Sequence, residues 1–214
     1  MPIVQRQIIG LGMLYAKPTI VATQMLASMT ELPDPTRAEV SDVATAVLVG
    51  ADCLMLSDET ASGQYPIESV MVMKRVICYT ESHAPLKAVF PEYPENHSRQ
   101  AAISKGLISL AESIQAKAIV AETRSGATAL QISSLRPEIP LVAVTSEKRT
   151  AQQLAIVYDV KAYVRPVDKL AAQKLTNWLR ENDVFAKGDI VVTASGQYPG
   201  VVGTTDTIKV RVLE

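Results

Sequence analysis

Hydroxyl-bearing side chains stand at the ends of two strands that the sequence predicts near its amino-terminal end. Thr23 closes a predicted strand of residues 19–23, and Ser57 follows a predicted strand of residues 52–56. In parallel α/β folds the carboxyl end of a strand faces the crevice that binds the ligand, so polar groups at these places could contact a substrate. The alternative is that each hydroxyl only hydrogen-bonds to the end of its own strand, and the pattern alone leaves both interpretations open.

A third hydroxyl-rich turn joins a predicted strand to a predicted helix farther along the chain. Its residues are Thr123, Arg124, Ser125, Gly126, Ala127 and Thr128. Backbone N–H groups, hydroxyls and the helix dipole converge in such a turn and can hold a phosphate group. Lys148 and Arg149 could reach the same phosphate. Ordinary helix capping would also explain the turn, and a solvated surface would also explain the two cations.

The elements that must position these groups alternate between strands and helices, which is typical of βα units on a parallel sheet. Besides the two strands above, we predict strands over residues 118–122, 141–145, 161–164, 190–194 and 207–212. We predict helices over residues 3–15, 37–49, 98–113, 125–135, 147–156 and 171–182, and another that begins at Tyr65-Pro66. Thr36 and Glu39 have the spacing of a capping box at the start of the second helix.

A proline-rich segment interrupts the alternation and predicts a domain boundary. It contains Pro85, Pro91 and Pro94, and it divides the chain into residues 1–83, a linker of residues 84–97, and a domain of residues 98–214. Two strands in roughly 80 residues cannot close a barrel, which typically needs about 250 residues, and they make a poor independent sheet. The first region therefore looks like part of something larger, whereas the second can form a domain by itself.

Composition excludes several other classes of protein. The chain has 214 residues, and 21 Lys and Arg against 22 Asp and Glu give a net charge of −1, which argues against nucleic acid as a partner. No apolar run is long enough to cross a bilayer, and no secretory signal is evident, so we expect no membrane partner. Cys53 and Cys78 lack metal-ligand spacing, and we predict buried, reduced thiols in a cytoplasmic protein.

Three motifs resemble those of the pyruvate kinase family in order and spacing. They are residues 22–29 (ATQMLASM), 35–43 (PTRAEVSDV) and 50–61 (GADCLMLSDETA). The resemblance continues through residues 116–120, 123–129, 136–137 and 203–205, so it covers essentially the whole chain. It implies an α/β fold in which an incomplete TIM-barrel segment, the last two β/α units, precedes the family's C-terminal regulatory α/β domain with its mostly parallel sheet.

The resemblance implies a role in glycolysis, namely phosphoryl transfer from phosphoenolpyruvate to ADP to give pyruvate and ATP. The family uses Mg²⁺ and K⁺, but its metal ligands, its substrate-clamping Arg and its phosphoryl-stabilising Lys match nothing in this sequence, so we expect no metal site in the chain. The implied partners are the N-terminal half of the barrel, in the same chain or a separate subunit, the two substrates, a sugar-phosphate or nucleotide effector, and further copies in a homotetramer.

The resemblance also implies roles for individual residues. Thr23 matches the family's active-site threonine beside the enolate carbon, and Ser57 matches a serine implicated in passing a proton to that carbon, which hydroxyls can relay through water. Asp58 stands where the commonest family pattern has glycine, and its Cβ changes the local turn. Arg37 and Glu39 match a motif of the active-site wall and a subunit interface, although a surface capping pair would also explain them.

In the second domain the resemblance assigns two effector loops. The turn of residues 123–128 matches the loop that holds the phosphate of an allosteric sugar phosphate or nucleotide. Residues 195–205 resemble the family's second effector loop, which would use Ser195, Gly196, Gly200, Gly203 and Thr204. We predict that Trp178 packs on a helix, and we assign no role to His83 or His97.

Three explanations of this chain compete at the level of sequence. It could be a fragment of a longer enzyme, a separately encoded half that assembles with an N-terminal half, or a stand-alone phosphate-binding module without catalysis. The first two belong to the enzymes and the third to the binding proteins. The sequence does not separate them.

Overall fold

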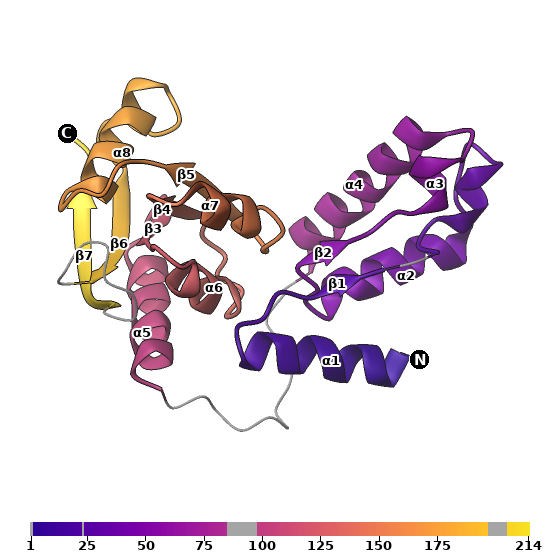
Figure 1. The fold of residues 1–214 in the computed structure, drawn as a ribbon, viewed down its shortest axis with the longest axis horizontal. Helices are drawn as coiled ribbons and strands as arrows, with labels where there is room; N and C mark the ends of the chain where they lie inside the picture. Colours follow the sequence, from indigo (N-terminus) through magenta and orange to yellow (C-terminus); the bar gives the residue numbers. More distant parts are fainter. Residues whose placement is uncertain (1, 23, 85–97, 197–204) are drawn as a thin grey trace. The chain divides into compact units, whose positions relative to one another are not determined.

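A computed structural model describes residues 2–22, 24–84, 98–196 and 205–214, so the predicted linker of residues 84–97 lies outside it except for Ala84. The chain divides into two compact units (Figure 1). The first comprises residues 1–13 and 17–93, and the second comprises residues 14–16 and 94–214. Each unit has its own hydrophobic core.

The first unit alternates helices with two short strands. Its elements are α1 (Pro2–Leu14), β1 (Ile20–Val21), the 3₁₀ helix η1 (Ala27–Thr30), α2 (Arg37–Leu48), β2 (Cys53–Leu54), α3 (Asp58–Ala61) and α4 (Pro66–His83). Strands β1 and β2 pair in parallel, with Ile20 opposite Cys53 and Val21 opposite Leu54. Their carboxyl ends therefore lie side by side. Both strands are shorter than predicted, because within the described residues each pairs only with the other and the ladder of hydrogen bonds is short.

The core of the first unit lies between the strands and the helices that follow them. Its buried residues come from the segment after β1, from α2 and from α4, namely Met25, Leu26, Met29, Val43, Ala46 and Met73. Val21 of β1 and Leu54 and Leu56 around β2 pack against this cluster. The segments that leave the carboxyl ends of both strands are thus anchored by apolar packing.

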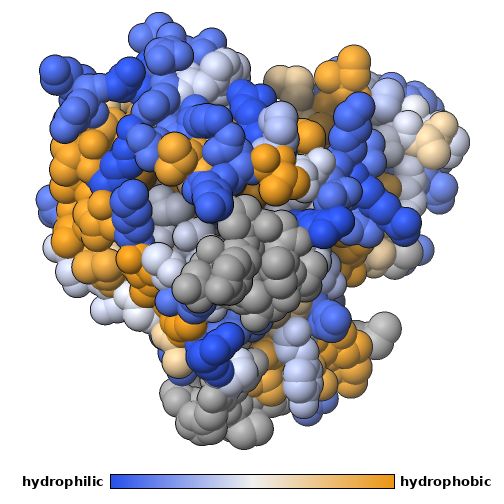
Figure 2. Space-filling model, turned by 60° about the vertical axis from the view of Figure 1, so that its left-hand side comes forward, coloured by the Kyte–Doolittle hydropathy of each residue, from blue (hydrophilic) through white to orange (hydrophobic). Residues whose placement is uncertain are grey.

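Apolar side chains also lie at the surface, as the face in Figure 2 shows. In the second unit the exposed apolar residues include Ile208, Val210 and Val212 of its last strand. In the first unit they include Ile3, Val4, Ile8 and Leu11 of α1 and Ile67, Val70 and Met71 of α4. The outer faces of α1 and α4 are therefore far less polar than a solvated helix face usually is.

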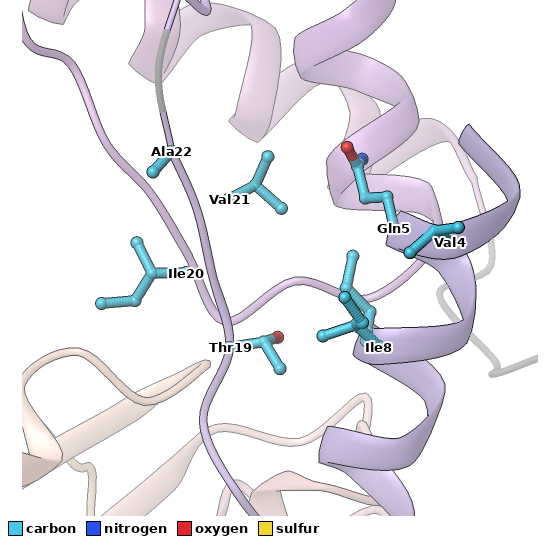
Figure 3. A pocket seen from close by; sticks show the side chains of 8 residues that line it. Val4, Gln5, Ile8, Thr19, Ile20, Val21 and Ala22 are labelled. Atoms are coloured by element: carbon cyan, nitrogen blue, oxygen red, sulfur yellow. The ribbon is translucent and has the colours of Figure 1, made fainter. Parts of the chain in front are cut away.

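A pocket of about 250 Å³ opens between α1 and β1 in the first unit (Figure 3). It is lined by Val4, Gln5, Ile8, Ile9, Thr19, Ile20, Val21 and Ala22. Most of these side chains are apolar, and Ile8 and Ile20 are 58% and 49% exposed. This side of β1 is thus an open apolar surface.

The second unit is a five-stranded sheet covered by helices. Its elements are α5 (Arg99–Ser113), β3 (Ala118–Glu122), α6 (Ala127–Ser133), β4 (Leu141–Thr145), α7 (Lys148–Leu154), β5 (Val160–Val164), α8 (Ala171–Glu181), β6 (Ile190–Gly196) and β7 (Thr205–Val212). The strand order is β5-β4-β3-β6-β7, and only the β6–β7 pair is antiparallel. The predicted mostly parallel sheet is confirmed.

Alternate residues of the central strands build a core on each face of this sheet, as expected for strands buried on both sides. Ile119 and Ala121 of β3 pack with α5, α6 and α7, whereas Ala118 and Val120 pack with α8. Figure 1 shows the same division, with α8 on one face and the other three helices opposite. The sheet therefore holds the carboxyl ends of β3 and β6 in fixed positions at one edge.

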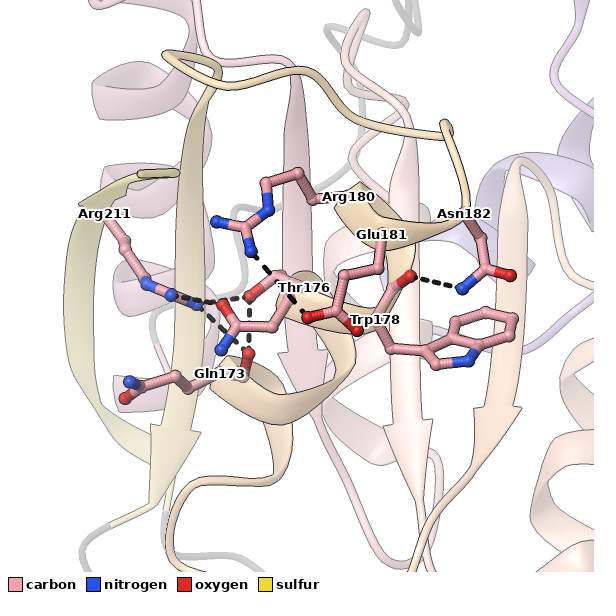
Figure 4. Close-up of polar contacts among 8 residues, drawn as sticks. Gln173, Thr176, Trp178, Arg180, Glu181, Asn182 and Arg211 are labelled. Atoms are coloured by element: carbon pink, nitrogen blue, oxygen red, sulfur yellow. Dashed lines mark hydrogen bonds and ion pairs between the residues drawn. The ribbon is translucent and has the colours of Figure 1, made fainter.

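Polar contacts attach α8 to the edge strand β7 (Figure 4). The Arg211 guanidinium donates to the Thr176 hydroxyl at 2.6 Å, to the Gln173 carbonyl at 3.1 Å and to the Asn177 side-chain oxygen at 2.5 Å. Trp178 of α8 is 41% exposed rather than buried, and the Arg165 guanidinium lies 4.8 Å from its ring centre. The ring of Tyr163 also meets that of Trp178 edge-on, with 6.0 Å between ring centres, so Trp178 packs against Tyr163 and Arg165 while part of it stays exposed.

The prediction of two buried thiols is wrong. Both cysteines are free, but Cys78 is exposed and Cys53 is only half-buried. Cys78 lies on the last turns of α4, whose outer face also exposes Tyr79. The apolar neighbours of Cys78 in the sequence therefore do not cover it in the fold.

Candidate functional site

The first candidate site lies at the carboxyl ends of β1 and β2. Thr23 follows β1 but lies outside the described residues. Ser57 follows β2 and precedes α3, with φ −122° and ψ −102°, and its side chain makes no capping hydrogen bond to that helix. Asp58, at the position where the family pattern has glycine, begins α3 and is exposed. Because the two strands are parallel and in register, the segments that carry Thr23 and Ser57 leave the same edge of the sheet.

A buried carboxylate lies between these two segments. Glu59 of α3 is 1% exposed, and its oxygens accept hydrogen bonds from the backbone N–H of Leu26 at 3.0 Å and of Ser57 at 2.7 Å. Burial, and to a smaller extent the nearby charge of Glu39, tend to raise the pKa of this carboxyl, but backbone hydrogen bonds from Leu26, Ser57 and Glu59 itself outweigh them and hold the pKa below its ordinary value. Sequence analysis missed this residue, although an acidic side chain two positions after Ser57 was a visible signal.

The Glu39 carboxylate of α2 also accepts hydrogen bonds from the segment that follows β1. The predicted capping box is confirmed, because the Thr36 backbone and hydroxyl donate to the Glu39 carboxylate at 2.7 and 2.9 Å, and the Glu39 N–H donates to the Thr36 hydroxyl. The Ser28 N–H and hydroxyl donate to the same carboxylate at 2.7 and 2.5 Å. Burial raises the pKa of Glu39, but these hydrogen bonds lower it below its ordinary value. Arg37 is exposed at the first turn of α2.

Replacing Glu39 by alanine is expected to destabilise the first unit by about 1–3 kcal/mol, because a helix cap and a tie to Ser28 are lost together. Since the pKa of Glu39 is depressed in the folded state, its stabilisation is present near neutral pH and is lost as the pH falls through the folded pKa, below the ordinary value of 4.5. Urea unfolding at pH 7 and pH 3 measures both effects. Asp42→Asn, at an exposed position later on the same helix, is the control. An equal loss of unfolding free energy in both variants would contradict the stabilising role of the Glu39 cap.

The second candidate site is the turn between β3 and α6. Gly126 has φ +88°, which favours glycine, and an added Cβ would also lie 3.4 Å from Thr150. The Thr123 hydroxyl accepts a hydrogen bond from the Gly126 N–H at 2.9 Å, and the Thr150 hydroxyl donates to the Arg124 carbonyl at 2.8 Å. These contacts fix the backbone of the turn, while Ser125 at its tip is exposed.

The two predicted effector loops begin at neighbouring strands of the sheet. Strands β3 and β6 pair in parallel, with Ala121 opposite Ala194, so the turn after β3 and the segment after Ser195 and Gly196 leave the same edge. The Thr128 hydroxyl lies 2.7 Å from the Thr205 hydroxyl at the start of β7, and Thr128 is 5% exposed. The predicted loop residues Gly200, Gly203 and Thr204 lie outside the described residues.

Charged side chains lie within the turn of residues 123–128 and on the first turn of α7. Lys148 and Arg149 are exposed on the first turn of α7. Arg124 is exposed and its Nε lies 3.4 Å from a carboxylate oxygen of Glu147. Thr150 of α7 donates to the Arg124 carbonyl, so the first turn of α7, which carries Lys148 and Arg149, lies beside this turn, and Glu147 partly balances the positive charge.

The described residues provide no metal site and no membrane span. Within the described ranges, no three His, Cys, Asp or Glu side chains form a group that could hold a metal ion. No helix among the described residues is long and apolar enough to cross a membrane. His83, at the end of α4, stacks on Tyr79, and His97 lies outside the described residues.

Comparison with known proteins identifies both units. A family model described as "Pyruvate kinase, barrel domain" matches residues 1–70, and one described as "Pyruvate kinase, alpha/beta domain" matches residues 101–211. Pyruvate kinase 2 of Synechocystis sp. is 39% identical over 100% of this chain and 36% of its own length. Pyruvate kinase of Thermotoga maritima is 41% identical over 98% of this chain and 45% of its own length.

Structural comparison agrees with the sequence comparison. A crystal structure of a pyruvate kinase from Cryptosporidium parvum matches with a TM-score of 0.86 and 31% identity, over 99% of this chain and 43% of that chain. The fold and the positions of the two candidate sites define an α/β protein that joins a barrel segment to an α/β domain with a mostly parallel sheet. The chain belongs to the pyruvate kinase family. It spans less than half the length of these relatives.

Proposed function

We propose that this chain forms part of a pyruvate kinase, which transfers a phosphoryl group from phosphoenolpyruvate to ADP. The observation that supports this most is that the barrel and α/β family models match the two units in order, with 39–41% identity to pyruvate kinases over nearly the whole chain. The first unit would supply a minor part of the active site, and the second would bind the effector. The boundaries proposed for them are residues 1–83 and 98–214, joined by a linker.

In this proposal the first unit acts on the enolate that remains after phosphoryl transfer. Protonation of the enolate carbon gives pyruvate, and the hydroxyls of Thr23 and Ser57 would relay that proton through water. The adjacent carboxyl ends of β1 and β2 support this pairing, since the segments that carry both residues leave one edge. Arg37 and Glu39 would contribute to the wall of the site or to a subunit interface, with Glu39 also serving as the cap described above.

The metal ions, the rest of the barrel and the other subunits that the reaction needs would come from outside the described residues. The ions inferred for the assembled enzyme are Mg²⁺ and K⁺, whose charge assists phosphoryl transfer when they are bound. The rest of the barrel would cover β1, and the apolar pocket between α1 and β1 supports a partner on that side. The exposed apolar faces of α1 and α4 also support further subunit contacts, and a homotetramer is the proposed assembly.

The second unit would bind the phosphate of a sugar phosphate or nucleotide. Three features support this role. Ser125 is exposed at the tip of the turn, and the first turn of α7 carries exposed cations. Both proposed loops also begin at adjacent strands. A stand-alone phosphate-binding module without catalysis is the second candidate function. It is favoured by one observation, namely that the second unit has a complete sheet with a core on each face.

A chimera tests the proposed function directly. The part of the Thermotoga maritima pyruvate kinase that this chain does not cover is fused to residues 1–214, and pyruvate formation is followed in a coupled assay with phosphoenolpyruvate, ADP, Mg²⁺ and K⁺. We expect turnover of about 1 s⁻¹ or more, within the usual range for kinases. A chimera that folds and binds phosphoenolpyruvate but has no turnover would favour the module without catalysis.

Replacing Thr128, the last residue of the turn, by alanine tests the proposed effector site. Loss of one hydroxyl donor to a charged group is expected to weaken binding by about 1.5–3 kcal/mol, which is roughly tenfold to a hundredfold in affinity. Calorimetry with ribose 5-phosphate, AMP, glucose 6-phosphate and fructose 1,6-bisphosphate measures the change. Thr207→Val, which removes an exposed hydroxyl from β7, is the control. Equal affinity of Thr128→Ala and the parent would contradict the assignment.

A further inference from the structure

The two segments that leave β1 and β2 share one buried anchor, the carboxylate of Glu59. One of its oxygens accepts from the N–H of Leu26, which follows β1, and the other accepts from the N–H of Ser57, which follows β2. Leu26 and Glu59 are 33 residues apart in sequence, so this contact joins separate segments rather than closing a local turn. Each oxygen therefore serves a different segment.

Because Glu59 is buried, its carboxylate must be hydrogen-bonded within the protein. The side chain is 1% exposed, and a buried carboxylate is costly unless it is hydrogen-bonded. Its pKa is held below the ordinary value, so the side chain is charged near neutral pH and both hydrogen bonds are charge-assisted. An amide side chain has the same shape but only one acceptor oxygen, and it could satisfy just one of the two N–H groups.

A second carboxylate restrains the same stretch of backbone independently. Glu39 of α2 accepts from the N–H and hydroxyl of Ser28, two residues after Leu26. Leu26 itself is fully buried in the core of the first unit. The segment after β1 is thus held by apolar packing, which Leu56 after β2 shares, and by Glu39, whereas the Glu59 carboxylate accepts hydrogen bonds from both segments.

We propose that Glu59 is a positioning residue, which ties the backbone at Ser57 to the backbone that follows Thr23 and so sets the spacing of the two segments at the active site. This inference rests on the proposed function, in which Thr23 and Ser57 act together. Glu59 touches backbone N–H groups and takes no part in proton transfer. Its contribution is to keep the two hydroxyl-bearing segments at a fixed separation, because small displacements of reacting groups are costly in rate.

Amide hydrogen exchange of the 214-residue chain, measured by NMR, tests the tether without relying on activity. In Glu59→Ala the amides of Leu26 and Ser57 are expected to exchange at least about tenfold faster, because each loses a hydrogen bond to a charged group. In Glu59→Gln the exchange rate of one of these two amides is expected to increase strongly, and that of the other is expected to change little. Asp58→Asn changes an exposed carboxylate of the same helix and should leave both rates within about twofold.

Titration gives a second signature of the same tether. The amide proton shifts of Leu26 and Ser57 should move with one shared midpoint, below 4.5, since a single carboxylate accepts from both. Unchanged exchange at either amide in Glu59→Ala, or separate midpoints, would overturn the tether. If Glu59→Ala does not fold, the isosteric Glu59→Gln decides the question by the selectivity described above.

Kinetics of the chimera test the positioning role itself. Glu59→Gln should lower kcat by about tenfold or more with little change in the KM for phosphoenolpyruvate, as expected when alignment rather than binding is lost. Faster hydrogen exchange at the Leu26 or Ser57 amide in Glu59→Gln, together with an unchanged kcat, would overturn the positioning role. A wild-type chimera without turnover would count against the proposed function, while hydrogen exchange would still decide whether Glu59 ties the two segments.

Discussion

A purified polypeptide of these 214 residues is expected to form pyruvate at least about 10⁴-fold more slowly than the chimera with the Thermotoga maritima sequence. Charge stabilisation by one cationic group in phosphoryl transfer is worth roughly 10³–10⁵ in rate, and metal ions neutralise further charge. When the sequence is compared with the pyruvate kinase motifs, the family's cationic groups and metal ligands match nothing in it. Positioned hydroxyls alone cannot replace that stabilisation.

The coupled assay with phosphoenolpyruvate, ADP, Mg²⁺ and K⁺ measures this difference. The uncovered part of the Thermotoga maritima protein, expressed alone, is one control, and its mixture with this chain is another. Recovered turnover in the mixture would show that the two parts assemble without a covalent link. Turnover of about 1 s⁻¹ from the 214-residue chain alone would contradict the prediction.

Ser125→Asp is expected to weaken binding of every phosphate effector by more than about a hundredfold. The substitution places a negative charge at the exposed tip of the turn, where the phosphate is proposed to lie, and like charges within a few ångströms repel by about 1 kcal/mol in water and several near a protein surface. The turn itself should persist, because Gly126, Thr123 and Thr150 hold its backbone without the Ser125 side chain.

Calorimetry with the same four phosphate compounds measures the loss. Ser125→Ala separates the charge from the missing hydroxyl and should weaken binding by less than Ser125→Asp. Ser109→Asp places the same charge at an exposed position of α5 and should change affinity little. Equal affinity of Ser125→Asp and the parent would show that the turn is only a helix cap, and failure of all four compounds to bind the parent at millimolar concentration would show the same.

Regular elements and their order followed from local sequence. The periodicity over residues 118–122 and 141–145 predicted strands that coincide with β3 and β4, because central parallel strands are buried on both faces and contain continuous apolar runs. The capping box of Thr36 and Glu39 was also predictable, because its partners are three residues apart and the geometry is local. The short helices η1 and α3 were not predicted, since four residues carry no periodic signal.

The candidate sites were predicted only as separate motifs. Sequence placed Ser57 after a strand and Thr123 before a helix, and the resemblance to pyruvate kinases connected them with chemistry. It did not show that Arg124 would be tied to Thr150, or that Cys78 would face solvent, because neither fact depends on neighbours along the chain. Side-chain exposure on α4 depends on what packs against that helix.

Tertiary structure alone decided which distant groups meet. It brought the carboxylate of Glu59 to the N–H of Leu26 across 33 residues, and the hydroxyl of Thr128 to that of Thr205 across 77 residues. Local spacing determines helices and caps, because their hydrogen bonds join residues a few positions apart, and it indicates strands by the placement of apolar side chains rather than by their hydrogen bonds. Contacts between segments are determined instead by the register of parallel strands and by the apolar cores that bury them, and no short stretch of the sequence contains both partners.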